Sequence, residues 1–159
     1  MEGGQLMSGD IRPADFGHPS VQALLELHFQ ALIGASPLGK AHVLDLSALQ
    51  APDISTWVLW SGDTAVSTGA LRHLSDTQGE IKSMRTHPDS LGEGHGAAML
   101  EHIVGEARQR GYRTLSLETG TGPAFDPALR LYRRRGFVSG PAFGSYQAGT
   151  FNQFFHLSL

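Results

Sequence analysis

The chain of 159 residues contains no cysteine. This absence excludes disulfides, a thiolate nucleophile and a zinc ion held by sulfur. Neither sign of charge dominates, because 12 lysines and arginines face 15 aspartates and glutamates, giving a net charge of −3. A mildly acidic chain is a poor candidate for binding nucleic acid or anionic membranes. The sequence also lacks a signal peptide and any apolar run long enough to cross a bilayer, so we expect a cytoplasmic protein.

The length and composition predict one domain. Apolar residues make up 40% of the chain and charged residues 17%, which is ordinary for a globular protein. A chain of this size builds a single hydrophobic core, so we expect residues 1–159 to form one domain.

The first half predicts a helix followed by antiparallel strands. We expect a strand over 5–12, a helix over 21–33 with Ser20 as N-cap and Gly34 at its end, a helical turn at 47–49, and strands over 54–60, 64–73 and from 80. Short turns separate the three strands, so they form a meander.

The second half alternates helix and strand. A helix follows Gly96, with Ala97, Leu100, Ile103, Val104 and Ala107 on one face and Gly111 at its end. A strand over 113–119 follows, then a helix capped by Asp126 and closed by Gly136, and strands from 137 and over 150–159. This order predicts one mixed sheet with helices on both faces.

Three alternating glycines, Gly92, Gly94 and Gly96, connect the strand from Glu80 to the next helix. Such a loop brings main-chain N–H groups and a helix N-terminus to an anion, so it predicts a phosphate site. The spacing does not fit a dinucleotide-binding fold, and Ala97 stands where a P-loop needs lysine. A plain turn that starts a helix is the simpler alternative.

Two motifs resemble the GNAT superfamily of CoA-dependent N-acyltransferases. One is the loop from Leu91 to Gly96, and the other is Leu131-Tyr132-Arg133-Arg134-Arg135-Gly136-Phe137. The resemblance implies an α/β (α+β) fold, with a mixed, mostly antiparallel central sheet of about seven strands and helices on both faces. The segments 80–86, 117–120 and 125–128 are similar to those of small bacterial proteins labelled indoleacetate acetyltransferases.

The resemblance implies acetyl-CoA as the acyl donor. The residues expected at the cofactor are Met84, Arg85, Thr86, Gly92, Glu93, Gly94, His95, Gly96, Ala97, Ala128, Leu131 and Arg135. Leu91 departs from the family pattern, because an arginine or glutamine usually holds the pyrophosphate there. We therefore expect weaker CoA binding, with Lys82, Arg85 or the run from Arg133 to Arg135 as possible compensation.

The chemistry requires a base for the amine and an acid for the departing thiolate. The resemblance places Glu80 as the base, with a solvated glutamate or an ion pair to Lys82 or Arg85 as the alternative, and Glu118 is the rival base. Tyr132 is the expected acid, since its ordinary pKa of about 10 is close to that of a thiol; a core aromatic is the alternative. A backbone N–H near Met84 would polarise the carbonyl.

The eight histidines do not predict a metal site, because no pair has the spacing of a zinc helix. His42 is a candidate for the acceptor pocket, against the plainer reading of an exposed loop residue. We expect the ring of His95 to face solvent or the CoA phosphates.

The sequence therefore predicts an acetyl-CoA-dependent N-acetyltransferase in which a small-molecule primary amine attacks the thioester directly. The alternatives are a protein or peptide amine acetyltransferase and a non-catalytic CoA-binding module. A homodimer is expected by analogy alone.

Overall fold

Three long strands form the predicted meander. In the computed structural model, which describes residues 10–35 and 46–159, these are β2 (Ile54–Ser61), β3 (Thr64–His73) and β4 (Gln78–Thr86). They pair antiparallel, as expected from the short turns between them. The edge strand β1 (Ile11–Pro13) pairs with β2. Residues 5–9 of the expected first strand lie outside the described part of the chain.

Helices and strands then alternate along the chain. α3 (His95–Gln109) precedes β5 (Thr114–Gly120), and α4 (Asp126–Arg135) precedes β6 (Val138–Gly140) and β7 (Asn152–Ser158). The described residues also contain three short 3-10 turns, which are η2 (Ala48–Gln50), η3 (Pro88–Ser90) and η4 (Pro123–Phe125). Across the described residues the seven strands form one sheet in the order β1-β2-β3-β4-β5-β7-β6, and only β4 and β5 run parallel. The predicted mixed, mostly antiparallel sheet is confirmed.

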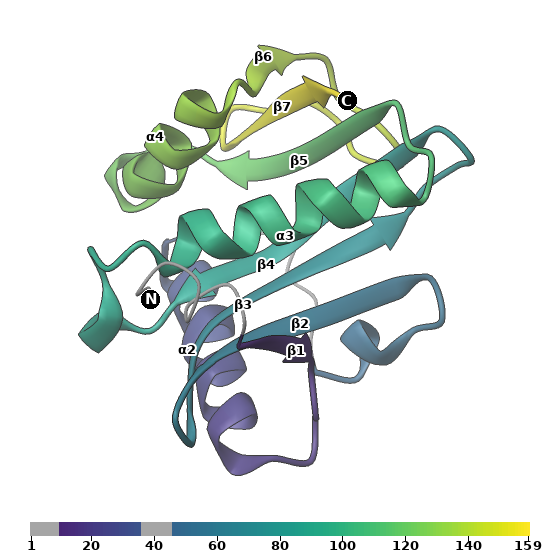
Figure 1. The fold of residues 1–159 in the computed structure, drawn as a ribbon. Coiled ribbons are helices and arrows are strands. Elements are labelled where there is room, and N and C mark those ends of the chain that lie inside the picture. Colours follow the sequence, from purple (N-terminus) through teal and green to yellow (C-terminus); the bar gives the residue numbers. More distant parts are fainter. Residues whose placement is uncertain (1–9, 36–45) are drawn as a thin grey trace.

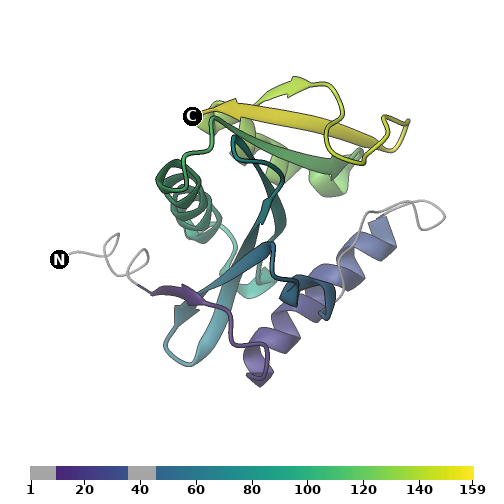
Figure 2. The same cartoon turned by 90° about the vertical axis from the view of Figure 1, so that its right-hand side faces the viewer.

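The helices cover both faces of this sheet. α3 and α4 lie on one face, while α2 (Pro19–Ala35) lies on the other (Figures 1 and 2). Each face buries its own apolar cluster: Ile103 and Leu115 belong to the larger cluster under α3, and Leu24 and Val58 to the smaller one under α2. The two clusters fix the sheet from both sides, so the strands hold their positions at the site described below.

β4 and β5 separate halfway along their length. Their pairing runs only from Gln78↔Thr114 to Ile81↔Leu117, although β4 continues to Thr86 and β5 to Gly120. Beyond Ile81 the edge of β4 that faces β5 has no strand partner in the described structure. The two strands therefore open a gap at their carboxyl ends.

The same part of β4 carries a β-bulge. Arg85 faces Thr68 of β3 while Lys82 faces Ala70, so three steps on β4 span two on β3. Ser83 takes up the extra residue with φ of +57°, a left-handed conformation seen at no other described non-glycine residue. Because Thr68 and Ala70 lie on one face of the sheet, the bulge places Lys82 and Arg85 on one face too.

Several local expectations are corrected. α2 begins at Pro19 and continues past Gly34 to Ala35. Ser20 is not its N-cap, because its hydroxyl accepts a hydrogen bond from the backbone N–H of Ala65, 2.8 Å away. The imidazole of His18 instead accepts the N–H of Ser20 at 3.0 Å.

Two helix assignments in the second half are also wrong in detail. Asp126 is the first residue of α4 rather than its cap, because η4 continues into the helix through Phe125, which makes no side-chain cap. On α3, Ala97 is exposed and Met99 takes its place on the buried face. Gly111 and Gly136 end their helices with positive φ, as predicted.

Candidate active site

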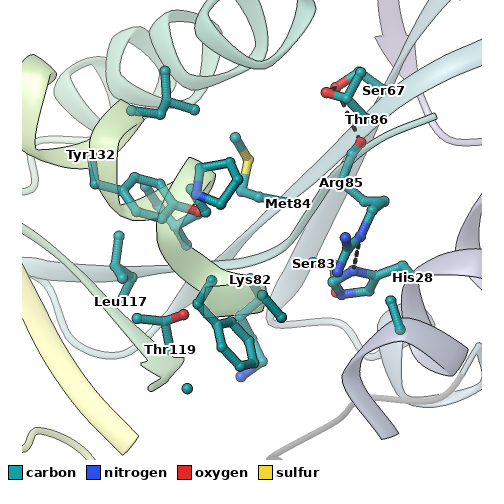
Figure 3. A pocket seen from close by; sticks show the side chains of 18 of the residues that line it. His28, Ser67, Lys82, Ser83, Met84, Arg85, Thr86, Leu117, Thr119 and Tyr132 are labelled. Carbon is teal, nitrogen blue, oxygen red and sulfur yellow. Dashed lines mark hydrogen bonds between the residues drawn. The ribbon is translucent and has the colours of Figure 1, made fainter. Parts of the chain in front are cut away.

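A cavity of about 540 Å³ fills the gap between β4 and β5 (Figure 3). β4 contributes residues 81–86, β5 contributes 117–120, and α4 contributes Ala128, Leu131 and Tyr132. α2 closes the opposite side with Leu27, His28 and Ala31. Because β4 and β5 separate after their paired segment, the cavity passes between them and is bounded by α4 on one face of the sheet and by α2 on the other.

The glycine loop at the start of α3 offers main-chain donors. Gly94 is the N-cap with φ of +86°, and Gly92 has φ of +79°, a region that favours glycine. No side chain caps the helix, and its first internal hydrogen bond runs from Ala98 N to Gly94 O at 3.0 Å. The N–H groups before Ala98 therefore have no partner within the helix. The loop has the form predicted for an anion site, and the anion itself stays a prediction.

The predicted cofactor residues do not all reach the cavity. Met84, Arg85, Thr86, Ala128 and Leu131 line it, whereas residues 92–97 and Arg135 do not. Leu91 stands at this edge with 65% of its surface exposed.

Arg135 at the end of α4 is already engaged, because its Nε donates to the carboxylate of Glu101 on α3. Arg133 lies over the ring of Phe155 at 5.4 Å. Two residues of the arginine run therefore already have partners within the protein, although Arg133 is exposed.

The ring of His95 turns into the protein. It is 7% exposed, and its Nε2 lies 3.0 Å from Oε1 of Glu93. The expectation of a solvent-facing ring is wrong, because His95 lies one turn before Met99 on the buried face of α3. A contact between His95 and the CoA phosphates stays a prediction.

Tyr132 projects from α4 into the cavity (Figure 3). Its ring packs edge-on against Phe137 with 5.6 Å between centroids, and the residue is 5% exposed. Burial raises the pKa of its phenol above the usual value, while the nearby charge of Arg85 acts in the opposite direction. The hydroxyl therefore carries its proton at physiological pH, and the same burial makes it a weaker acid than a free phenol.

Glu80 is buried on the α2 side of β4 and does not line the cavity. Its Oε2 accepts hydrogen bonds from Lys82 Nζ at 3.1 Å and from the hydroxyl of Tyr146 at 2.5 Å. Its Oε1 has no hydrogen-bond partner, and Arg72 Nη1 is 4.0 Å away. The ion pair with Lys82, one of the sequence alternatives, is present, and a solvated Glu80 is excluded. Its role as base stays a prediction.

Glu118 does line the cavity, on the β5 side. Burial raises the pKa of the Tyr146 phenol, and the charge and hydrogen bond of Glu80 and the charge of Glu118 raise it further. Sequence reasoning missed Tyr146, because its loop between β6 and β7 carries no motif. Of the two carboxylates predicted as bases, Glu118 is thus the one whose residue lines the cavity.

Sequence reasoning also missed His28. This buried residue of α2 accepts a hydrogen bond at Nδ1 from Nε of Arg85, 3.2 Å away. Burial, aided by the charge of Arg85, lowers the pKa of His28 to about 3, so its ring is neutral. Burial also lowers the pKa of Arg85. Only the helical period of α2 could have signalled that His28 faces the sheet, four residues after Leu24.

The remaining histidines have structural contacts. His73 Nδ1 is 2.6 Å from the hydroxyl of Tyr112, His102 packs edge-on against Trp57, and His87 accepts the N–H of Asp89. The described residues contain no group of three acidic or histidine side chains placed to hold a metal ion. The candidate His42 lies outside those residues. No described helix is both long and apolar enough for a membrane span.

Comparison with known proteins agrees with this geometry. A sequence model of the acetyltransferase (GNAT) family matches residues 21–137. The chain is 38% identical over 149 residues to the uncharacterized N-acetyltransferase YedL of Escherichia coli, covering 94% of each chain. It is 39% identical over 113 residues to the IAA acetyltransferase of Azospirillum brasilense, covering 69% of this chain and 71% of the relative. A GNAT family acetyltransferase from Elizabethkingia anophelis, solved with acetyl-CoA bound, shares the fold with a TM-score of 0.68, 18% identity and coverage of 94% and 97%.

Proposed function

Since the chain belongs to the acetyltransferase (GNAT) family and is an N-acetyltransferase that uses acetyl-CoA, we propose that its acceptor is a small-molecule primary amine bound in the cavity between β4 and β5. The size of this cavity and its closure by α2 support a small acceptor over a protein tail. The earlier expectations of the family, the enzyme class, the fold and the acetyl donor are confirmed.

The donor is expected to lie along the free edge of β4. The residues present fit it: the first-turn N–H groups of α3 suit its phosphates, and Met84, Ala128 and Leu131 line an apolar path toward Tyr132. The bound thioester supplies an activated acetyl group at the end of this path. The main-chain N–H groups beyond Ile81, which lack a β5 partner, suit the polarisation of its carbonyl oxygen.

Proton transfer then falls to the side chains around the cavity. The amine loses a proton to a carboxylate, its nitrogen forms a bond to the acetyl carbon as the carbon–sulfur bond breaks, and Tyr132 gives its proton to the leaving sulfur. Glu118 is favoured as the base that touches the acceptor, because it lines the cavity. Glu80 would act only through Tyr146 or Lys82, to which it is hydrogen-bonded.

The observation that carries the proposal is the buried, protonated hydroxyl of Tyr132 directed into a cavity that Glu118 also lines. The test is a thiol-release assay with acetyl-CoA and a panel of amines. We expect Tyr132→Phe to lower kcat about 100-fold or more with little change in KM for acetyl-CoA. Tyr112→Phe is the matched control, since Tyr112 is also buried but bonds to His73 outside the cavity, and it should keep near wild-type kcat.

The same assay separates the two carboxylates and the alternatives. We expect Glu118→Gln to lower kcat strongly and Glu80→Gln to lower it less. If Glu80→Gln has the larger effect, Glu80 is the base. Acetylation of peptide amines alone would favour the protein acetyltransferase. Tight binding of acetyl-CoA without turnover of any amine would favour a non-catalytic module. The homodimer, the single domain and the cytoplasmic location stay predictions from the sequence.

A further inference from the structure

The guanidinium of Arg85 is a cation at the cavity that has no acidic partner among residues 10–35 and 46–159. Its Nε donates to His28, and no carboxylate of the described residues forms an ion pair with it. Arginine keeps its charge in proteins, and the neutral ring of His28 orients this charge without cancelling it. The α2 side of the cavity therefore carries a fixed positive charge.

The other four N–H groups of this guanidinium have no protein acceptor in the described part of the chain. Arginine has five donors, and among the residues that the structure describes only Nε–H has an acceptor. The described side-chain atoms that are sealed from solvent without a partner are Thr56 Oγ1, Glu80 Oε1, His95 Nδ1 and His102 Nε2. Arg85 is not among them, so its N–H groups without a partner keep contact with solvent, and the residue lines the cavity.

The second basic side chain at the cavity has a partner. Lys82 donates to Glu80 at 3.1 Å and to Tyr146 at 2.6 Å, and its side chain is 7% exposed. The bulge at Ser83 places Arg85 on this same face but leaves it bonded to His28 instead of Glu80. A partly desolvated charge without a counterion is costly, so this position favours an anionic ligand.

The position of the charge points to the acceptor. Arg85 and Tyr132 line the same cavity. Burial raises the pKa of the Tyr132 phenol, and the charge of Arg85 opposes this rise, so the guanidinium acts on the side chain expected at the leaving sulfur. Figure 3 shows His28 and Arg85 on one side of the cavity, with Tyr132 and Leu117 on the other. A molecule held by Arg85 would thus reach toward the reacting centre from the α2 side.

We propose that Arg85, oriented by His28, binds a carboxylate of the acceptor, so that the substrate is a small primary amine that also carries a carboxylate, as amino acids do. This inference rests on the proposed function and narrows it. A planar guanidinium with two free nitrogens matches a carboxylate through two parallel hydrogen bonds. His28 is a positioning residue in this arrangement.

The test compares L-amino acids with their carboxamides and with the corresponding decarboxylated amines in the thiol-release assay. We expect the acids to be preferred, although the carboxamides have the less basic and more readily deprotonated amine. Arg85→Gln should raise KM for the acids about 10- to 100-fold and reduce the ratio of acid to carboxamide turnover. Arg85→Lys should restore part of this ratio. Arg113→Gln, which removes an exposed charge at the far end of β5, is the matched control.

Three results would overturn the proposal while acetyl transfer stands. The preferred acceptors could lack an acid, or Arg85→Gln could weaken acids and carboxamides equally. A tenfold weaker binding of CoA to Arg85→Gln, with the acid preference intact, would assign the guanidinium to a cofactor phosphate. If no amine is acetylated, calorimetry measures whether the same amino acids bind to the CoA-loaded protein. If the wild type binds these amino acids and Arg85→Gln does not, the carboxylate site is supported and acetyl transfer to amines is refuted. If the wild type binds none of them, the carboxylate site and acetyl transfer are both refuted.

Discussion

Replacement of Gly69 by alanine tests how tightly the core supports the bulged strand. A Cβ atom at Gly69 would lie 2.7 Å from Ile103 Cδ1, 2.7 Å from Met84 Sδ and 2.8 Å from Met99 Cγ. All three distances are shorter than real contacts, so the side chains must move. Overpacking of this kind costs about 1–3 kcal/mol. Because Met84 lines the cavity, the displacement also reaches the site.

Gly105 on α3 is the matched control, since a Cβ there meets no atom within 4 Å. Gly105→Ala should stabilise the protein by about 0.4–1 kcal/mol, because alanine is the better helix former. The assay is urea unfolding of the three proteins, with Tm as a second readout. Gly69→Ala should lower Tm by roughly 2–12 °C, at about 2–4 °C per kcal/mol for a domain of this size. A Gly69→Ala protein as stable as the wild type would refute the packing described here.

Two further predictions concern buried charge. Lys82→Met should lower the free energy of unfolding by about 3–5 kcal/mol in urea titrations, because it leaves the buried carboxylate of Glu80 without its closest cation. A loss below about 1 kcal/mol would contradict a stabilising ion pair between Lys82 and Glu80. In the folded protein the pKa of His28 is lowered to about 3, whereas in the unfolded chain the imidazole has its ordinary pKa of 6.5. Between these two pH values the unfolded chain binds a proton that the folded protein does not bind. The neutral His28 therefore contributes its full stability above pH 6.5, and this contribution is lost as the pH falls toward 3. The wild type should therefore lose about 2–3 kcal/mol more than His28→Asn between pH 6.5 and 4.5, and parallel pH profiles would contradict a buried neutral imidazole.

The fold could be predicted from the sequence because its signals are local. Turn residues, the alternation of apolar side chains and the helix stops at Gly111 and Gly136 act over a few residues, and the structure follows them closely. The misplaced caps at Ser20 and Asp126 show where this fails. The hydroxyl of Ser20 is bonded to the N–H of Ala65, 45 residues away, and so does not cap α2. The 3-10 turn η4 leads directly into α4, so Asp126 is a helical residue and not the cap.

The candidate site was only partly visible in the sequence. Tyr132 and the glycine loop belong to motifs, and the structure places Tyr132 in the cavity and the loop at its border. Glu80 and Lys82 are two residues apart on one strand, so their pairing could be foreseen as an alternative. Tyr146 could not, because only the pairing of β7 with β5 and β6 brings its loop over Glu80.

The sequence by itself determined the order of elements, the uncapped start of α3 and the family. The tertiary structure alone decided which side chains share the cavity. In a regular strand, Lys82 and Arg85 would point to opposite faces, because their separation is an odd number of residues. The bulge at Ser83 adds a residue and turns both toward α2, where His28 receives Arg85. That conformation is set by pairing with β3 and by packing against two helices, and these contacts join segments far apart in the chain.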